Sequence, residues 1–287
     1  MWKVKLPDNT KVLEHVKTAF TYADENKKYN FSALEITEID KLYSHYDSVK
    51  AVACAELEGL ALGKNLLNAI HTAYNETQQG GRLNFLRNEL LLNAITCPCC
   101  GISVPDELDH YLPKEDYRGL SIYVRNLIPY CHKCNNKKRT VSGLNPEERF
   151  INAYFDDLPM DKQFFFAKAI LNGKNLRFEF QVHKIDGLDD QLVTQMNFQM
   201  TRVDLRKRLG RELNNYFSLL SSFVQVAYEI GGKLSVQKNL ELAAKKQIAD
   251  FGINHWRHAV IAALAEHDGF CDGGFYEPWS LARPDSV

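Results

Sequence analysis

Two Cys-x-x-Cys pairs are the residues of this sequence whose type and spacing point most directly to chemistry. The first pair is Cys97 and Cys100, in the stretch CPCCG, and the second is Cys131 and Cys134. Two such pairs can place four thiolates around Zn²⁺ in a tetrahedron, each sulfur about 2.3 Å from the metal. A site closed by four thiolates keeps no open coordination position, so we expect it to stabilise the fold and leave catalysis to other residues.

The remaining cysteines are given other roles. Cys99 lies inside the first pair and is expected to be a spare thiol, although a shifted register that uses Cys99 stays open. The alternative to zinc is one redox pair with two buried thiols, but a thioredoxin-like pair needs a βαβ setting that this region does not show. Cys54 lies in an Ala- and Leu-rich segment and is expected to be a small core residue.

Between and beside the cysteine pairs lie polar residues that suit hydrolytic chemistry. Asp109 and His110 are neighbours in a short apolar frame, Asn126 precedes the apolar run LIPY, and Asn135 directly follows the second pair. Carboxylate and amide oxygens are ligands that suit Mg²⁺ or Mn²⁺. A histidine with a pKa near 6.5 can accept a proton from water at neutral pH. These residue types match the needs of phosphodiester hydrolysis.

Basic residues gather in the same region, although the whole chain has a net charge of −1. Residues 110–140 contain seven lysines and arginines against two acidic residues. Such a local patch can hold phosphates even on a protein without net positive charge. A second stretch, residues 201–212, has five basic against two acidic residues, and a solvated helix face explains it equally well. The basic residues expected to contact DNA are Lys114, Lys137, Lys138 and Arg139.

The order Cys-x-x-Cys, Asp-His, Asn, Cys-x-x-Cys-Asn and Lys, within residues 97–139, resembles the HNH endonuclease family of the ββα-metal fold. The resemblance implies that His110 is the general base and that Asn126 holds the loop that orients it. Asp109 and Asn135 would then bind one catalytic Mg²⁺ or Mn²⁺. Asn135 stands where the family often has histidine, so the chain looks like an HNN variant whose preferred cation stays open. The resemblance also implies a helix from near Cys131 through Lys138.

The style of the motif is similar to that of HNH effectors in bacterial anti-phage systems, including the Septu and retron-associated types that work with an ATPase. This resemblance implies DNA as the substrate and an ATPase or another defence protein as a partner. The flanking regions are long enough to dock a partner, form a homo-oligomer or clamp DNA. The alternative is a zinc-stapled module that binds nucleic acid or protein without catalysis.

The flanks of the cysteine region read as mostly helical. We expect an N-terminal helical region (1–95), a zinc-stapled HNH module (96–144) and a C-terminal, mostly helical region (145–287). In the last region the stretch LRFEFQVHKI alternates like a strand, and long helices are expected over 189–230 and 235–267, with a break at Gly231 and Gly232. The predicted class is therefore mainly α with a small α+β insert.

Composition places few further limits on function. Hydrophobic residues make up 45% of the chain and charged residues 25%, as in ordinary soluble proteins. No apolar run approaches the roughly 18 residues needed to span a bilayer, and the charged N-terminus lacks the apolar core of a signal peptide. We therefore expect a cytoplasmic protein without a membrane partner, in a reducing compartment where clustered cysteines bind metal more often than they form disulfides.

Overall fold

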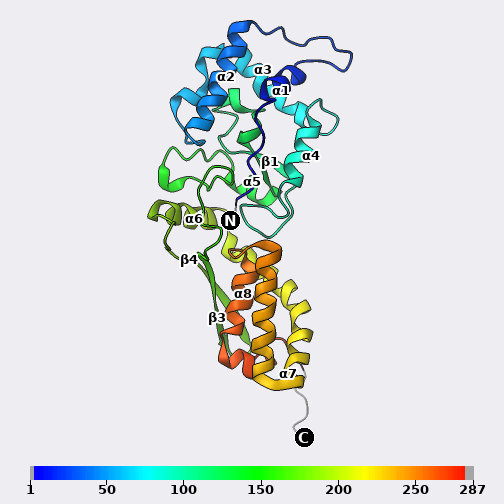
Figure 1. Cartoon of the computed structure of the whole chain (residues 1–287), viewed down its shortest axis with the longest axis vertical. Coiled ribbons are helices and arrows are strands. Elements are labelled where there is room, and N and C mark those ends of the chain that lie inside the picture. The colour runs from blue at the N-terminus through cyan, green and yellow to red at the C-terminus, as the bar shows by residue number, and fades with distance from the viewer. Residues whose placement is uncertain (1–2, 282–287) are drawn as a thin grey trace. The chain divides into compact units, whose positions relative to one another are not determined.

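The computed structural model describes residues 3–281, which divide into two compact units with the boundary between Asp157 and Leu158. In Figure 1 the first unit runs from blue to green and the second from green to red. Most of the regular structure is helical, and the strands form two separate antiparallel pairs. The expected class, mainly α with a small β part, is confirmed at this level. Among the described residues, no helix is long and apolar enough to cross a membrane.

Four α-helices come first in the first unit. They are α1 (Val12–Ala19), α2 (Ala33–Ser48), α3 (Gly63–Ala73) and α4 (Asn84–Leu92). Helix α2 begins at a capping box, in which the Ser32 hydroxyl accepts from the backbone N–H of Glu35 and the Glu35 carboxylate accepts from the backbone N–H of Ser32. The spacing of apolar residues along α2 makes one face of the helix buried, namely Ile39, Leu42, Tyr43 and Tyr46.

The segment that carries the cysteine pairs contains two short strands and a helix. Strand β1 (Glu107–His110) pairs antiparallel with β2 (Leu127–Tyr130), and every residue of β2 is buried. Cys131 follows β2 directly and is the N-cap of helix α5 (His132–Lys138). The predicted helix from near Cys131 through Lys138 is therefore confirmed. Helices α4 and α5 both pack against β1.

The loop between β1 and β2 is fastened to helix α2. The hydroxyl of Tyr46 donates to the backbone carbonyl of Arg125 at 3.2 Å, and the hydroxyl of Tyr123 donates to the carboxylate of Asp47 at 2.8 Å. The Arg125 guanidinium pairs with the same carboxylate. Because of such contacts, the N-terminal helices and the cysteine segment form one compact unit, which extends to Asp157. The boundaries predicted after residues 95 and 144 lie inside this unit.

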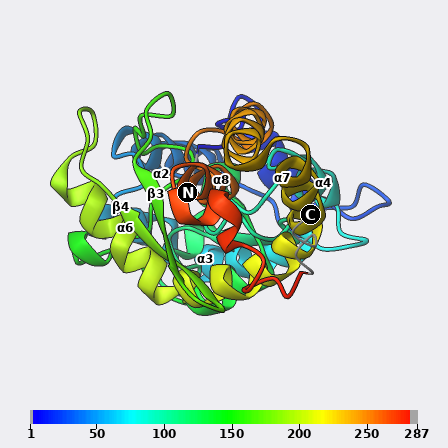
Figure 2. The same ribbon diagram turned by 90° about the horizontal axis from the view of Figure 1, so that it is seen from below.

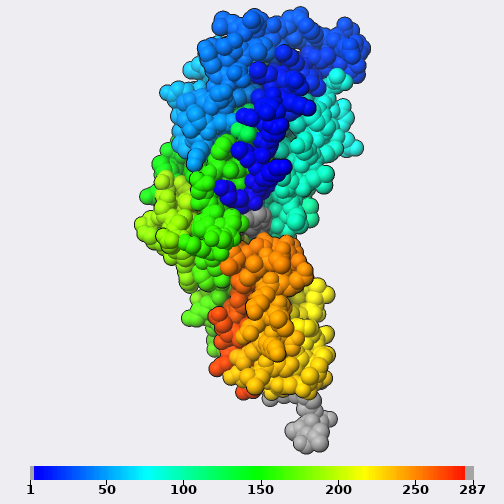
Figure 3. Space-filling model, in the orientation of Figure 1, coloured from blue at the N-terminus to red at the C-terminus, as the bar shows by residue number. Residues whose placement is uncertain are grey.

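The segment before α1 lies across the surface of the first unit, as the dark blue residues in Figure 3 show. The backbone N–H of Val4 donates to the carbonyl of Ala153 at 2.9 Å. The carbonyl of Pro7 accepts from Nε of Arg125, also at 2.9 Å. These bonds connect the start of the described chain to the β1–β2 loop and to the end of the unit.

The described part of the second unit is built on a β-hairpin, three α-helices and a short π-helix at Phe270–Gly274. Strands β3 (Phe165–Asn172) and β4 (Asn175–Val182) pair along their whole length, and helices α6 (Asp190–Arg202), α7 (Leu205–Phe251) and α8 (Trp256–Ala265) follow. Helix α8 packs on β3 and on α7. The predicted strand LRFEFQVHKI overlaps β4 over residues 176–182 and is confirmed there. Strand β3 is not predicted, because its sequence FFAKAILN lacks a regular alternation of apolar and polar residues.

Helix α7 is interrupted where the sequence predicts a break. Gly231 and Gly232 have non-helical dihedrals, and Gly232 has a φ of 61°, which favours glycine. The chain turns back at this point, so α7 consists of two arms (Figures 1 and 2). The predicted helices 189–230 and 235–267 are each divided once more, at Asp204 (φ 50°) and at Gly252 (φ 89°). Neither division is predicted from the sequence.

Candidate functional site

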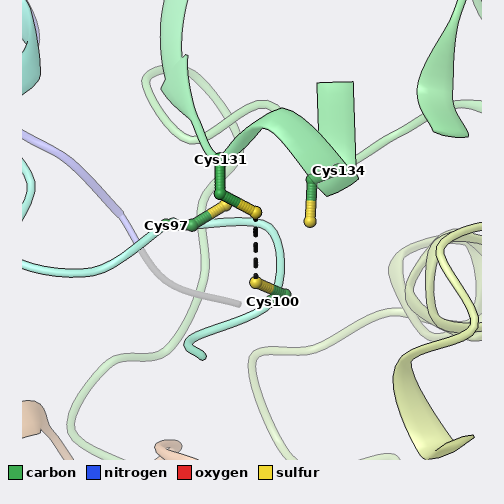
Figure 4. Close-up of side chains that lie close together, drawn as sticks. All are labelled: Cys97, Cys100, Cys131 and Cys134. Atoms are coloured by element: carbon green, nitrogen blue, oxygen red, sulfur yellow. Dashed lines mark hydrogen bonds between the residues drawn. The ribbon is translucent and has the colours of Figure 1, made fainter. Parts of the chain in front are cut away.

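The four predicted zinc ligands come together in the first unit. Cys97 and Cys100 lie on a turn in which the N–H groups of Cys100 and Gly101 both donate to the Cys97 carbonyl, and Gly101 has a φ of 69°. Cys131 and Cys134 lie at the start of α5. The four sulfur atoms lie within 4.8 Å of one another and face a common centre (Figure 4).

The spacing of the sulfur atoms fits a tetrahedral zinc ion. The sulfur atoms of Cys100 and Cys131 are 3.8 Å apart. Two thiolates on a tetrahedral Zn²⁺ with bonds of about 2.3 Å would be about 3.8 Å apart. All four cysteines are buried and outside disulfides, and burial raises the pKa of Cys97 well above its usual range. A cation would let these thiols ionise in the interior, so the four cysteines could hold a zinc ion.

The register of the first cysteine pair agrees with the prediction. The cluster contains Cys97 and Cys100, whereas Cys99 is buried but does not belong to it. The alternative register that uses Cys99 is therefore not supported by the positions of the sulfur atoms.

Asp109, predicted as a metal ligand, is paired with a lysine. Its side chain is 3% exposed, and its Oδ2 lies 2.9 Å from Nζ of Lys138, whose side chain is 0% exposed. The same ammonium donates to the backbone carbonyl of His110 at 2.7 Å. Burial raises the pKa of Asp109 to about 6, although the neighbouring Lys138 acts in the opposite direction. The prediction that Lys138 contacts DNA is corrected, because an enclosed, ion-paired ammonium cannot reach a phosphate on the surface.

Asn135, the second predicted metal ligand, donates its amide to Glu107. The Nδ2 atom of Asn135 lies 2.7 Å from Oε2 of Glu107, and Nδ1 of His132 lies 2.7 Å from Oε1 of the same carboxylate. Glu107 is not among the site residues predicted from the sequence. The signal that could have found it is its spacing, because residues two apart on a strand point to the same face. Glu107 and Asp109 therefore offer two carboxylates to the face of β1 that α5 covers.

His110, the predicted base, has a fixed orientation. Its Nε2 lies 2.9 Å from the carbonyl oxygen of Ser121, and its ring packs edge-on against Tyr74 with the ring centres 4.4 Å apart. A carbonyl oxygen can only accept, so Nε2 carries the ring proton and Nδ1 holds the lone pair. Burial lowers the pKa of His110 to about 3, with Lys114 among the smaller causes. The imidazole is thus neutral at pH 7, with its lone pair on Nδ1.

Asn126 holds the loop that carries Ser121. It is fully buried, and its amide makes hydrogen bonds from both ends. The Oδ1 atom accepts from the backbone N–H of Leu112 (2.8 Å) and from the hydroxyl of Tyr46 (3.1 Å), while Nδ2 donates to the carbonyls of Leu112 (3.0 Å) and Leu120 (3.3 Å). This residue therefore fixes both ends of the loop, and with it the carbonyl that receives the His110 proton.

The other residues predicted to contact DNA lie nearer the surface. Lys114 is half-buried, with its ammonium 5.0 Å from the centre of the Tyr74 ring. Lys137 is half-buried and Arg139 is exposed at the C-terminal end of α5. Their contact with DNA stays a prediction.

The structure brings the predicted site residues together on two faces of one strand. On one face, α5 presents Asn135 and Lys138 to Glu107 and Asp109. On the other, His110 contacts Tyr74 and the carbonyl of Ser121. Backbone alternation along β1 accounts for this separation of the predicted base from the predicted ligand beside it.

Comparisons with known proteins give partial similarities. No family model and no solved structure matches the chain. It is 26% identical to protein ea31 of Escherichia phage lambda over 188 residues, which cover 62% of this chain and 64% of that protein. It is 37% identical to the Septu protein PtuB of Bacillus thuringiensis over 71 residues, or 25% of this chain and 26% of that protein. The chain therefore covers less than two thirds of either relative. The similarity to PtuB and the four-cysteine cluster fit a zinc-stapled module.

Proposed function

We propose that this chain is a metal-dependent endonuclease of the HNH type, which hydrolyses phosphodiester bonds of DNA with His110 as the general base. The observation that carries the proposal is the orientation of His110. Its Nε2 is bound to the Ser121 carbonyl at 2.9 Å, on a loop that the buried Asn126 holds at both ends. A neutral imidazole whose Nδ1 can accept a proton has the form that a base needs to activate water.

Phosphodiester hydrolysis of this type also needs a divalent cation, and the oxygen donors beside α5 suit one. Glu107, Asp109 and Asn135 offer carboxylate and amide oxygens, the donor types that bind Mg²⁺ or Mn²⁺. Such a cation would stabilise the negative charge that develops on the phosphate. For Asp109 to serve as a ligand, the Lys138 ammonium has to leave its carboxylate.

The cysteine cluster and the basic residues near the surface have separate roles in this proposal. Zinc on the four thiols would hold the start of α5 beside the turn at Cys97 and keep Asn135 in position. Lys114, Lys137 and Arg139 would bind flanking phosphates. Each of these roles can be abolished by a substitution of the residue that performs it, while His110 is left unchanged.

A second candidate function is a zinc-stapled module that binds nucleic acid or protein without cutting it. The ion pair between Lys138 and Asp109 favours this alternative, because it satisfies the predicted metal ligand with a protein cation. In that case His110 and Asn126 would stabilise the loop and take no part in a reaction.

The proposed biological role is defence against phage, in the cytoplasm and together with a partner protein. The local similarity to the Septu protein PtuB supports this role. The partner is proposed to be an ATPase or another defence protein, and self-association of this chain is a further option. Co-purification of the chain with the product of a neighbouring ATPase gene would test the partnership.

The experiment that tests the nuclease is the nicking of supercoiled plasmid by the full chain, with Mg²⁺ or Mn²⁺ and with or without the partner. Wild type should nick the plasmid and His110→Ala should not. His183→Ala is the matched control, because His183 is an exposed histidine of the second unit and its loss should leave cleavage intact. If His110→Ala cuts as fast as wild type, His110 is not the base. DNA binding without cleavage by wild type under every condition would favour the binding module.

A further inference from the structure

A histidine, a cysteine and a glutamate come together at the C-terminal end of α2, in a group that shares no residue with the four-cysteine cluster. The Nε2 atom of His45 lies 3.7 Å from the sulfur of Cys54, and one carboxylate oxygen of Glu56 completes a group whose ligand atoms all lie within 4.8 Å of one another. From its Ala- and Leu-rich surroundings in the sequence, Cys54 is expected to be a small core residue. The structure corrects this, because Cys54 is half-buried and its thiol faces His45.

The backbone between His45 and Cys54 is shaped so that the two side chains meet. Helix α2 ends with bonds from the N–H groups of Val49 to the carbonyl of His45 and of Ala51 to the carbonyl of Tyr46. Lys50 and Ala51 then have φ values of 50° and 61°, which are unfavourable for residues other than glycine. Ala51 is fully buried, so the surrounding packing holds this turn in place. The chain thereby returns past the end of α2 and sets Cys54 against His45.

The donor set and its spacing suit a borderline-soft divalent cation. A thiolate and an imidazole on a tetrahedral Zn²⁺ would lie about 3.6 Å apart, given bonds of about 2.3 Å to sulfur and about 2.0 Å to nitrogen. The 3.7 Å between the atoms of His45 and Cys54 is close to this value. Imidazole, thiolate and carboxylate are the three ligand types that zinc sites use. We infer that His45, Cys54 and Glu56 form a second zinc site, with three protein ligands.

A site with three protein ligands differs in kind from the four-cysteine cluster. Four thiolates close the coordination shell of zinc, whereas three ligands leave a position for water or another molecule. Glu56 is exposed and His45 half-buried, so this position is open to solvent. The second site therefore binds zinc more weakly and exchanges it faster than the cysteine cluster.

The second site is directly connected to the loop that holds His110. The residues that follow His45 on α2 are Tyr46, whose hydroxyl donates to Asn126, and Asp47, whose carboxylate accepts from Tyr123. Zinc on His45 would fix the last turn of α2 and so the groups that hold this loop. The inference does not depend on the nuclease proposal, because it concerns metal binding alone.

The test is the zinc content and zinc titration of the full chain. Wild type should hold about two zinc ions per chain, one tight in the cysteine cluster and one weaker. Cys54→Ser and His45→Ala should each retain one, and Glu56→Gln should weaken the second site by about tenfold or more. Cys271→Ser removes a buried thiol of the second unit and is the matched control, which should still hold two.

Circular dichroism on the same samples separates loss of metal from loss of fold. Glu56→Gln is the safest variant for this comparison, because Glu56 is exposed and its change leaves the turn at Lys50 and Ala51 intact. If folded wild type takes up one zinc ion only, or if Cys54→Ser and Glu56→Gln titrate like wild type, the second site does not exist. Loss of the second ion in Cys54→Ser, with the first ion and the fold retained, would establish it.

Discussion

The ammonium nitrogen of Lys138 lies 2.9 Å from a carboxylate oxygen of Asp109, and both side chains are enclosed by the protein. The same ammonium donates to the carbonyl of His110, so one lysine contacts both members of the Asp-His pair. Buried ion pairs of this kind add little net stability, but the loss of one partner leaves an uncompensated charge in the interior. Lys138 is therefore paired with the carboxylate of Asp109, which the sequence predicts to bind a catalytic cation.

Replacement of Lys138 should destabilise the first unit strongly. We expect Lys138→Met to lower the free energy of unfolding by about 3–5 kcal/mol at pH 7, because Asp109 is left buried without a partner. Lys133→Met, an exposed lysine of the same helix, should change it by no more than about 0.5 kcal/mol. Urea denaturation measures both. The double variant Asp109→Asn with Lys138→Met should regain part of the lost stability. Equal stability of Lys138→Met and Lys133→Met would show that the ion pair does not form.

Asn126 should contribute more to stability than the residues that bind it. Asn126→Ala removes four hydrogen bonds and leaves buried backbone groups of Leu112 and Leu120 without partners. We expect a loss of roughly 3 kcal/mol, since each unsatisfied buried group costs about 1–3 kcal/mol. Tyr46→Phe removes one of these bonds and one to Arg125, and should cost about 1–2 kcal/mol. A loss for Asn126→Ala no larger than for Tyr46→Phe would contradict the assigned role.

The two histidines of the module should affect stability with opposite dependence on pH. Burial lowers the pKa of His110 to about 3 in the folded protein, below the ordinary value of 6.5. Between these values the unfolded chain binds a proton that the folded chain does not, so stability falls as the pH drops from 6.5 toward 3. His110→Gln should remove this part of the decline. Asp109 titrates in both proteins and cancels in the comparison.

His132 provides the contrast to His110. Its hydrogen bond to Glu107 raises the pKa of His132 above the ordinary value of 6.5. The stability that it contributes is fully present below pH 6.5 and is lost as the pH rises through the folded pKa. Urea denaturation of wild type, His110→Gln and His132→Gln between pH 4 and pH 8 would measure both effects, with the pH range chosen around these pKa values. A pH profile of His110→Gln identical to that of wild type would show that His110 is not buried as a neutral group.

Short-range sequence patterns predict much of the module that carries the candidate site. The Cys-x-x-Cys spacing identifies the four cysteines of the sulfur cluster, and the resemblance to the HNH family implies the start of α5 near Cys131. The strand β4 and the break at Gly231 and Gly232 follow from alternation and from glycine. Each of these features depends on residues close together in the chain.

Features that depend on distant contacts are not predictable in this way. Lys138 reads as one of three consecutive basic residues, and only the packing of α5 on β1 shows that its ammonium is buried against Asp109. Cys54 reads as a core residue until the turn at Lys50 and Ala51 brings it to His45. The single compact unit up to Asp157 arises from bonds between α2 and the β1–β2 loop, residues nearly 80 positions apart. No local pattern contains that information.

Removal of zinc from the cysteine cluster should unfold the cysteine segment of the first unit and leave the second unit folded. The sulfur atoms of Cys97, Cys100, Cys131 and Cys134 join the turn before β1 to the start of α5. Structural zinc contributes roughly 10–16 kcal/mol of binding free energy in small zinc domains. Without it, four buried thiols remain where a metal would hold the chain together. We expect strong chelation to abolish hydrogen-exchange protection over about residues 97–138 and to leave β3, β4 and α8 protected.

Cys134→Ser separates this effect from the proposed second site, because it removes one ligand of the cysteine cluster and none of the group around His45. It should reproduce the loss of protection over residues 97–138, as measured by hydrogen exchange and mass spectrometry. Cys271→Ser should exchange like wild type in the first unit, since Cys271 donates to the carbonyl of Leu264 in the second unit. If chelated and zinc-loaded wild type exchange alike over residues 97–138, the four cysteines hold their positions by packing alone and need no metal to do so.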